Sequence, residues 1–225
     1  MELIRLEKVT FAYPSRQPVL DGLDFQLSRG DRLGVVGPIG AGKSTMFRIA
    51  MGLLAPQAGR VLGLGQPCRH EKDFRPLREK VGFLFQDPDD QLFCPTVAED
   101  IAFGPLNLGW GREKALAAVS EVLAQLGMEG FEKRLTHQLS GGEKRLISLA
   151  AVLAMGPEAL LLDEPSTGLD PEHTAKLEEA LLSSDLAWAM VSHDREFLRR
   201  TCATVLELKD GHLTTPAAAA LPPLA

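Results

Sequence analysis

Residues 37–44 read GPIGAGKS, and this stretch limits what the chain can fold into more than any other. It follows DRLGVVG, a short apolar run that predicts a strand, and it leads into KSTMFRIAMGLL, whose apolar residues recur at helical spacing. A glycine-rich turn between a strand and a helix points backbone N–H groups at an anion, next to the positive end of the helix. A plain turn with an incidental lysine, the competing interpretation, would not need both flanks. We therefore predict a nucleotide-binding cradle made of Gly37, Pro38, Ile39, Gly40, Ala41, Gly42, Lys43, Ser44 and Thr45.

Two further acids complete the predicted chemistry of this cradle. Lys43 would reach the β- and γ-phosphates of ATP, and the Ser44 hydroxyl would ligate Mg²⁺. Residues 158–164, EALLLDE, predict a buried strand of a parallel sheet that ends in Asp163 and Glu164. Asp163 would hold Mg²⁺, and Glu164 would orient and polarise the attacking water. An acidic loop after a core strand is the alternative, and the cradle disfavours it.

Alternating strand and helix patterns predict an α/β fold with a mixed, mainly parallel sheet. LIRLEKVTFAY and LDFQLSRG predict an N-terminal antiparallel β portion, and helical patterns dominate from residue 96 to residue 155. We expect a single domain over residues 1–215, with a core of 1–88 and 157–215 and an inserted α-helical subdomain of 89–156. The Ala- and Pro-rich residues 216–225 are expected to form a disordered tail.

Charge and cysteine content exclude several other classes. The 225 residues include 30 acidic and 24 basic side chains, a formal net charge of -6. Nucleic-acid-binding proteins usually carry a basic excess, so we expect no nucleic-acid partner. The 3 cysteines are scattered and form no C-x-x-C pair, which predicts reduced thiols. Because no apolar run approaches the roughly 18 residues of a membrane span, a role at a membrane would be performed from outside the bilayer.

Residues 139–145, LSGGEKR, resemble the signature of ATP-binding-cassette (ABC) ATPases, which other P-loop families lack. The resemblance extends to about residue 213 and implies a P-loop NTPase (RecA-like) core. A hydroxyl and backbone N–H groups at this helix start offer a second anion site. Since the chain already has one cradle, the second site implies a head-to-tail dimer, as a homodimer or with a paralogue, in which each signature holds the partner's ATP. The signature residues are Ser140, Gly141, Gly142 and Glu143.

Other positions match the ABC pattern in the family's order. Tyr13 looks like the aromatic that stacks on adenine, with a core aromatic as the alternative. His193, in VSHD, looks like the histidine that contacts the γ-phosphate and Glu164, with a surface histidine as the alternative. The loop STGLD resembles the one that links the two active sites of the dimer through Ser166, Gly168 and Asp170.

Two positions depart from the usual ABC pattern. Ile39 stands where the family usually shows a polar Asn, and Glu143 stands where many relatives have Gln. The variable positions of the cradle contribute backbone more than side chain, so we expect ATP binding to survive the change at Ile39.

Residues 85–93, FQDPDDQLF, resemble the glutamine loop of ATPases from energy-coupling-factor and cobalt/nickel-type importers. In that pattern the glutamine, here Gln86, ligates Mg²⁺ or the attacking water. The loop behind it forms a groove for a membrane partner, and exposed apolar residues bordered by charge commonly mark such surfaces. A core phenylalanine beside a solvated acidic turn is the alternative. The expected partner contacts are Asp89, Asp90, Leu92 and Phe93.

The resemblance implies an ATP hydrolase with ATP and Mg²⁺ as cofactors and with catalytic roles for Lys43, Gln86, Glu164 and His193. It also implies a peripheral protein at the cytoplasmic face of the cell membrane, bound to integral membrane subunits that import metal ions such as cobalt or nickel, or vitamins. Two alternatives stay open. One is a soluble ABC-type ATPase that acts mechanically on nucleic acid or ribosomes, and the other is a regulatory subunit with negligible turnover.

Overall fold

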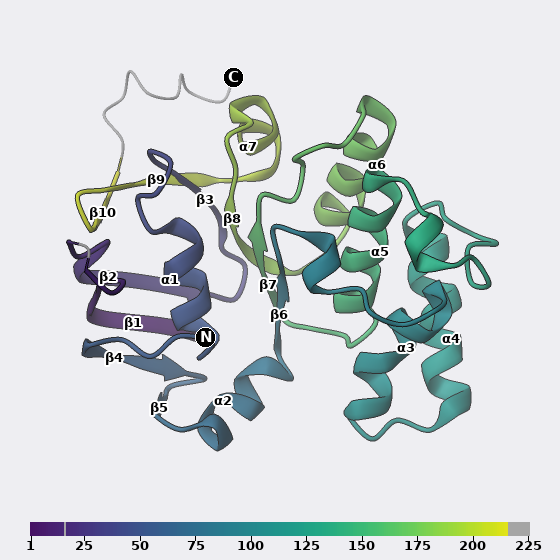
Figure 1. The fold of residues 1–225 in the computed structure, drawn as a ribbon, viewed down its shortest axis with the longest axis horizontal. Coiled ribbons are helices and arrows are strands. Elements are labelled where there is room, and N and C mark those ends of the chain that lie inside the picture. The colour runs from purple at the N-terminus through teal and green to yellow at the C-terminus, as the bar shows by residue number, and fades with distance from the viewer. Residues whose placement is uncertain (16, 216–225) are drawn as a thin grey trace.

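Two β-sheets of different kinds form the strand half of the molecule in the computed structural model, which describes residues 1–15 and 17–215 (Figure 1). The first is a four-stranded antiparallel sheet with the order β2-β1-β4-β5. Its strands are β1 (Glu2–Phe11), β2 (Leu20–Ser28), β4 (Ala58–Gly63) and β5 (Gln66–Cys68). This confirms the antiparallel β portion predicted at the N-terminus. The tail predicted to be disordered, residues 216–225, lies outside the described residues.

The second sheet has six strands in the order β10-β9-β3-β8-β7-β6. Its neighbouring strands run parallel except for β9 and β10, which pair antiparallel. The sheet is therefore mixed and mainly parallel, as predicted. Its strands are β3 (Arg32–Val36), β6 (Val81–Leu84), β7 (Ala159–Asp163), β8 (Ala187–Val191), β9 (Thr204–Lys209) and β10 (His212–Thr214).

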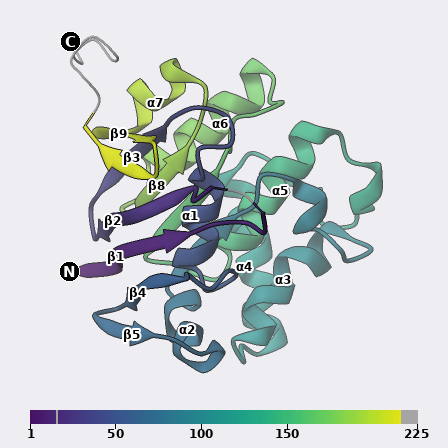
Figure 2. The same ribbon diagram turned by 60° about the vertical axis from the view of Figure 1, so that its left-hand side comes forward.

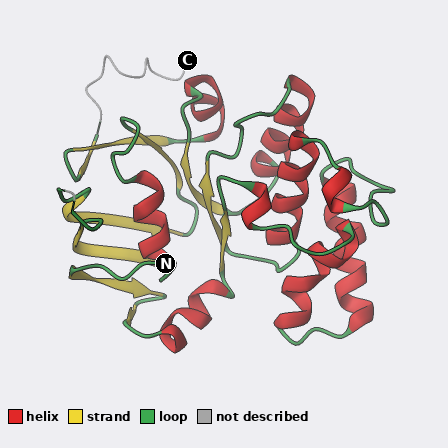
Figure 3. Cartoon of the chain, in the orientation of Figure 1, coloured by secondary structure: helices red, strands yellow, loops and turns green. Residues whose placement is uncertain are grey.

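Most helices gather on the side of the mixed sheet that faces away from the antiparallel sheet (Figure 3). Among them, α3 (Val97–Asn107) and α4 (Arg112–Gln125) pack on α5 (Gly141–Leu153), and α5 packs on α6 (Pro171–Leu182). The last helix, α7 (Arg195–Thr201), contacts α6. On the other side, α1 (Lys43–Ala50) contacts both β1 and β7 and therefore lies between the two sheets (Figure 2).

Side chains of the central strands alternate between two hydrophobic clusters. Leu161 of β7 packs with Phe47 of α1 and with the inner face of the antiparallel sheet. Its neighbours Leu160 and Leu162 point the other way and pack with α3, α5 and α6. A central strand covered on both faces must be apolar throughout, which explains why β7 reads as an unbroken run.

The predicted fold class is confirmed, including the inserted helices. The short helix α2 (Glu71–Arg78) was not predicted, and two single 3₁₀ turns, η1 (Pro88–Asp90) and η2 (Thr136–Gln138), also join the helical elements. The predicted boundaries after residues 88 and 156 stay a prediction. The hydrophobic cluster around α5 crosses both of them, because it also takes Leu84 of β6 and Leu160 of β7.

Candidate functional site

Four parallel strands bring the predicted site residues to one edge of the sheet. The cradle follows β3, Gln86 follows β6, Asp163 ends β7 and His193 follows β8. Ligands of open α/β sheets bind beyond the carboxyl ends of their strands. A hollow of ≈ 450 Å³ lies at this edge. It is lined by Tyr13, Val19, Ile39, Gly40, Ala41, Gly42, Lys43, Ser44, Thr45, Gln86, Glu164, Thr167, Val191 and His193.

The cradle presents the bare N-terminus of α1 to this hollow. The helix is preceded by Gly42, whose φ of 98° is left-handed, and no side chain caps it. The first N–H groups of a helix lack acceptors within it, so an uncapped start suits a phosphate. Gly37 is required for a different reason, since a Cβ there would lie 2.3 Å from the carbonyl oxygen of Leu208.

Lys43 bridges the cradle from inside. Its Nζ donates to the carbonyl oxygens of Gly37 and Pro38, each at 2.9 Å. Burial lowers the pKa of Lys43 from its ordinary value, and the charges of Glu164 and Asp163 oppose that shift. An ammonium group at this depth next to uncapped N–H groups makes the cradle strongly attractive to the phosphates of a nucleotide.

Ser44 and Asp163 form a ready pair of oxygen ligands. The Ser44 Oγ donates to Asp163 Oδ1 at 3.0 Å, whereas Oδ2 of this carboxylate is buried and has no hydrogen-bond partner within residues 1–15 and 17–215. Asp163 is only 1% exposed, and burial raises its pKa, with the charge of Glu164 acting in the same direction. An unpaired buried carboxylate oxygen beside a hydroxyl fits a hard divalent cation such as Mg²⁺. Gln86 lines the same hollow.

Glu164 is held in a strained backbone conformation. Its φ is 53°, in the left-handed region that side chains other than glycine rarely adopt. Its Oε1 lies 3.3 Å from His193 Nε2, and its Oε2 accepts from Thr167 Oγ1 at 3.1 Å and from the His193 N–H at 3.3 Å. Strain of this kind persists where the surroundings fix it and is concentrated at functional sites.

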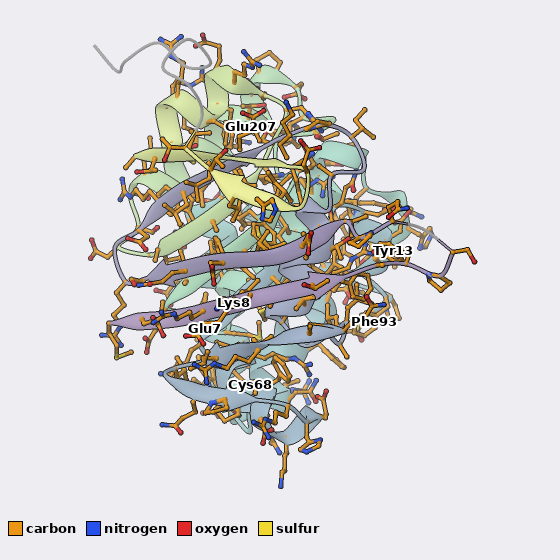
Figure 4. The ribbon with its side chains drawn as sticks, turned by 90° about the vertical axis from the view of Figure 1, so that its left-hand side faces the viewer. Glu7, Lys8, Tyr13, Cys68, Phe93 and Glu207 are labelled. Carbon is orange, nitrogen blue, oxygen red and sulfur yellow. The ribbon has the colours of Figure 1, made fainter. Side chains whose placement is uncertain are left out.

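Tyr13 and Ile39 define the outer rim of the hollow. Tyr13 lies just beyond the end of β1 (Figure 4), with its hydroxyl 3.0 Å from Thr45 Oγ1 and its ring edge-on to Phe11. Ile39 is 93% exposed at the tip of the cradle. That ATP binding survives with isoleucine at this position stays a prediction.

The signature residues do not line this hollow in the described part of the chain. Ser140 caps α5 in a reciprocal capping box, in which Glu143 Oε2 accepts from the Ser140 N–H at 2.7 Å. That backbone bond lowers the pKa of Glu143, and the nearby Arg134 adds to the shift. A Cβ on Gly141 would meet nothing within 4 Å, so the helix start is open to a bulky partner.

The loop after Glu164 runs from the cradle side toward α6. Ser166 Oγ lies 3.4 Å from Ser192 Oγ, directly before His193. Asp170 caps α6 and accepts from both the backbone N–H and the ring Nδ1 of His173, which holds the pKa of Asp170 below its ordinary value. Gly168 between them has a φ of 77°, so the turn favours glycine.

One of the expected partner contacts, Leu92, is placed differently from the prediction. Leu92 is only 8% exposed and packs in the core with Val97 and other helical residues, so the expectation that it lines an open groove is wrong. The side chain of Asp89 is exposed and pairs with Lys144 of the same chain at 2.6 Å, and its contact with a partner stays a prediction. Asp90 is exposed.

Phe93 is 64% exposed and lies edge-on against the ring of Phe103, with 4.8 Å between the ring centres (Figure 4). Leu106 and Leu116 are also exposed, and they line a neighbouring groove of ≈ 530 Å³ between α3 and α4. We call this set of four side chains the apolar patch. The alternative of a core-packed Phe93 does not hold.

Sequence reasoning missed three residues near the site: Thr167, Gln91 and Arg145. Thr167 bonds the carboxylate of Glu164, and the other two connect the loop of Gln86 to α5. Arg145 is a charged residue in a helix whose apolar side chains recur at the spacing of a buried face. A charged side chain in such a helix could have indicated a functional role for Arg145. Gln91 had none, because its contacts depend on where α5 packs.

Comparison with known proteins agrees with this geometry. A family model described as ABC transporter matches residues 20–167. The chain belongs to the ABC transporter family. It is an ATP-binding subunit of that family and an ATPase. No helix within residues 1–15 and 17–215 combines the length and the apolarity needed to cross a bilayer.

Two curated relatives show which ABC proteins this chain is similar to in sequence. A putative ABC transporter ATP-binding protein of Nitratidesulfovibrio vulgaris is 49% identical, covering 95% of this chain and 78% of the relative. The energy-coupling factor transporter ATP-binding protein EcfA of Methanothermobacter thermautotrophicus is 44% identical, with 94% of this chain and 69% of the relative covered. The name of the second relative supports the resemblance to the energy-coupling-factor branch.

Among solved structures, cbiO1 of Clostridium perfringens, part of the ABC transporter complex cbiONQ, has a TM-score of 0.82 at 32% identity, covering 95% of this chain and 87% of that one. The dimeric post-hydrolysis structure of the ATP-binding cassette MJ0796, bound to ADP and Pi, has a TM-score of 0.84 at 25% identity, with 94% and 96% covered. These similarities confirm the ABC cassette fold.

Proposed function

We propose that this chain is the ATP-hydrolysing subunit of an energy-coupling-factor-type importer for metal ions, such as cobalt or nickel, or for vitamins. It would act as a peripheral protein on the cytoplasmic face of the cell membrane and bind integral membrane subunits. The observation that carries the proposal is the apolar patch, which begins at Phe93 in the segment after Gln86 and continues along the groove between α3 and α4. The names of the EcfA relative and of the cbiONQ complex support it.

The patch suits an amphipathic helix of a membrane subunit. An apolar groove between two helices is a common seat for such a helix. Glu99 and Arg112 are among the residues that line the groove, so its mostly apolar lining includes both an acidic and a basic side chain. A ring of charge around an apolar centre is typical of surfaces that bind partners.

In the nucleotide site, Lys43 and the start of α1 would hold the phosphates. Mg²⁺ would be held by Ser44, Asp163 and Gln86, and when bound it would supply positive charge that offsets the negative charge of the transferred phosphoryl group. Glu164 would take a proton from the attacking water. His193 would keep the carboxylate of Glu164 pointed at the γ-phosphate position, because it contacts both oxygens of that carboxylate. The rim aromatic, Tyr13, would stack on adenine.

Hydrolysis would take place in a head-to-tail dimer, formed by two copies or by a pair with a paralogue. The support is the exposed start of α5, which within the described residues does not line the chain's own hollow and whose helix N-terminus suits an anion. The dimeric cassette bound to ADP and Pi has the same fold. ATP between the chains would close the dimer, hydrolysis would reopen it, and the membrane subunits would follow.

The test is co-purification from membranes. The tagged chain, expressed in its own host, should be recovered from detergent-extracted membranes together with integral membrane proteins, whose identification also names the cargo class. Recovery in the soluble fraction alone, with an ATPase rate stimulated by nucleic acid or ribosomes, would replace this function with a mechanical one. Lys43→Ala, which removes the ammonium from the cradle, should abolish nucleotide binding in either case.

A further inference from the structure

The backbone directly before Gln86 is connected to α5 by two sets of hydrogen bonds. The residue before it, Phe85, has its carbonyl oxygen bonded by Arg145 Nη1 at 2.9 Å. Its N–H donates to Gln91 Oε1 at 3.3 Å, and Gln91 Nε2 donates in turn to the carbonyl oxygen of Ser148 at 2.7 Å. Both peptide groups that flank Phe85 are therefore tied to one helix.

Arg145 makes this connection deep in the protein. It is 5% exposed, and its Nε has no hydrogen-bond partner among the described residues. Burial lowers the pKa of Arg145, while the charges of Asp87, Asp163 and Glu164 oppose the shift and favour the cation. Burying a cation without a full set of hydrogen-bond partners destabilises the fold. The buried position of Arg145 is therefore not explained by stability alone.

The same helix begins with the signature. Arg145 follows Ser140 by five residues, or about 7.5 Å along a helix axis. A third contact, the ion pair between Lys144 and Asp89, joins the helix to the acidic turn after Gln86. The first turns of α5 are thus bonded both to the backbone before Gln86 and to the turn after it.

We propose that Arg145 and Gln91 form a strap that fixes the backbone before Gln86 to α5 and so holds the carboxamide of Gln86 in its working position. The inference rests on the proposed role of Gln86 in hydrolysis. Arg145 and Gln91 are positioning residues, because they act on the peptide groups beside Gln86 and do not line the hollow.

Single variants give the first test. Arg145→Met removes the donors and retains an unbranched side chain suited to a buried site, and Gln91→Leu breaks the strap from the loop side. Each should lower kcat by about 10- to 100-fold, the order expected for a misplaced catalytic group, while the Kd for a fluorescent ATP analogue stays within about twofold. Arg145→Lys should regain part of the rate, since an ammonium group can still donate to the Phe85 carbonyl. Arg200→Met, which removes a surface pair with Glu178, is the matched control and should keep the wild-type kcat.

A double-mutant cycle separates positioning from structure. Gln86→Ala should lower kcat, and adding Arg145→Met to it should cause no further loss, because the strap acts only through Gln86. Multiplied losses in the double variant, or a wild-type kcat in both Arg145→Met and Gln91→Leu, would overturn the strap. A wild-type kcat in Gln86→Ala itself would instead overturn the role of Gln86 on which the strap depends. Should Arg145→Met fail to fold, Gln91→Leu completes the same cycle.

Discussion

At the scale of single residues, Glu164 illustrates how the site stores strain. Its backbone is left-handed and its carboxylate is buried against Thr167 and His193. A left-handed non-glycine residue costs about 1–3 kcal/mol, so the surrounding structure must stabilise this conformation. This conformation accompanies a carboxylate that lines the hollow and is held there by Thr167 and His193.

The first prediction concerns that carboxylate. Glu164→Gln keeps the shape and the contact with Thr167 but removes the base, so kcat should fall by at least about 10²-fold while ATP binding is retained. Because the bound ATP is not consumed, the variant should accumulate as a dimer in size-exclusion chromatography with ATP, and wild-type protein should not. Turnover near the wild-type rate would show that another group accepts the proton.

The second prediction concerns how the buried carboxylate of Asp163 affects the free energy of unfolding. Burial raises the folded-state pKa of Asp163 above the ordinary 3.8, so keeping it ionised near neutral pH destabilises the fold when no cation is bound. Asp163→Asn should therefore raise the free energy of unfolding by about 1–3 kcal/mol at pH 7 without Mg²⁺ and nucleotide, although it abolishes hydrolysis.

The pH dependence gives the control for Asp163→Asn. Below pH 3.8 the carboxyl group is protonated in both the folded and the unfolded state, so the advantage of the variant should vanish there. It should grow as the pH rises toward the folded-state pKa and be complete above it. Urea unfolding at several pH values measures the difference, and a variant less stable than wild type at pH 7 would contradict the argument.

At the scale of elements, α3 organises the segment that leads to the apolar patch. Asp100 is buried in this helix, and its Oδ1 accepts from the backbone N–H groups of Phe93 at 2.9 Å and Cys94 at 2.8 Å. Its Oδ2 accepts from Thr136 Oγ1 at 2.9 Å, which ties in the turn before the signature. One carboxylate thus holds two loops to the helix.

The third prediction follows from these bonds. Asp100→Ala leaves three donors without an acceptor and should destabilise the fold by about 3 kcal/mol in urea unfolding, since bonds to charged groups are the stronger kind. Asp100→Asn retains one acceptor oxygen and should lose less. The Kd for ATP should stay unchanged in both, because Asp100 does not line the nucleotide hollow. A loss below about 0.5 kcal/mol in Asp100→Ala would mean that water replaces the carboxylate.

The elements also show what the sequence can and cannot predict. The strand, cradle and helix of residues 32–50 follow from local patterns, because glycine positions and apolar spacing are properties of neighbouring residues. The helix α2 has a proline, Pro76, and few apolar residues, so its sequence does not read as a helix. Its Phe74 and Leu77 are buried against the sheets, and this tertiary packing decides the outcome.

At the scale of the whole molecule, the order of the strands assembles the site. The cradle, Asp163 and His193 are far apart in the chain, and they meet because β3, β8 and β7 are neighbours in one parallel sheet. The motifs predict which residues belong to the site. Which strands lie side by side is decided instead by packing between distant parts of the chain. The strap of Arg145 and Gln91 escapes sequence reasoning for the same reason, since it needs α5 to lie against the loop after β6.

The placement of two adjacent residues decides how the molecule would meet a membrane subunit. Leu92 is in the core and Phe93 is on the surface, although both are apolar and follow the same acidic turn. A segment outside a regular strand or helix has no fixed period, so the sequence alone could not separate them. The Asp100 bond to the Phe93 N–H fixes which side chain points outward.

The last prediction uses this difference. Phe93→Glu places a charge on the exposed patch, so transport, or co-purification with membrane subunits, should be lost while the thermal midpoint, the Kd for ATP and the basal ATPase rate of the isolated chain stay near wild type. Leu92→Glu instead buries a charge without a partner and should lower the thermal midpoint sharply. Leu182→Glu, on an exposed apolar residue of α6, is the matched control and should leave transport intact. Normal transport with Phe93→Glu would move the contact with the membrane subunit away from Phe93, because a carboxylate buried in an apolar contact surface without a partner weakens binding.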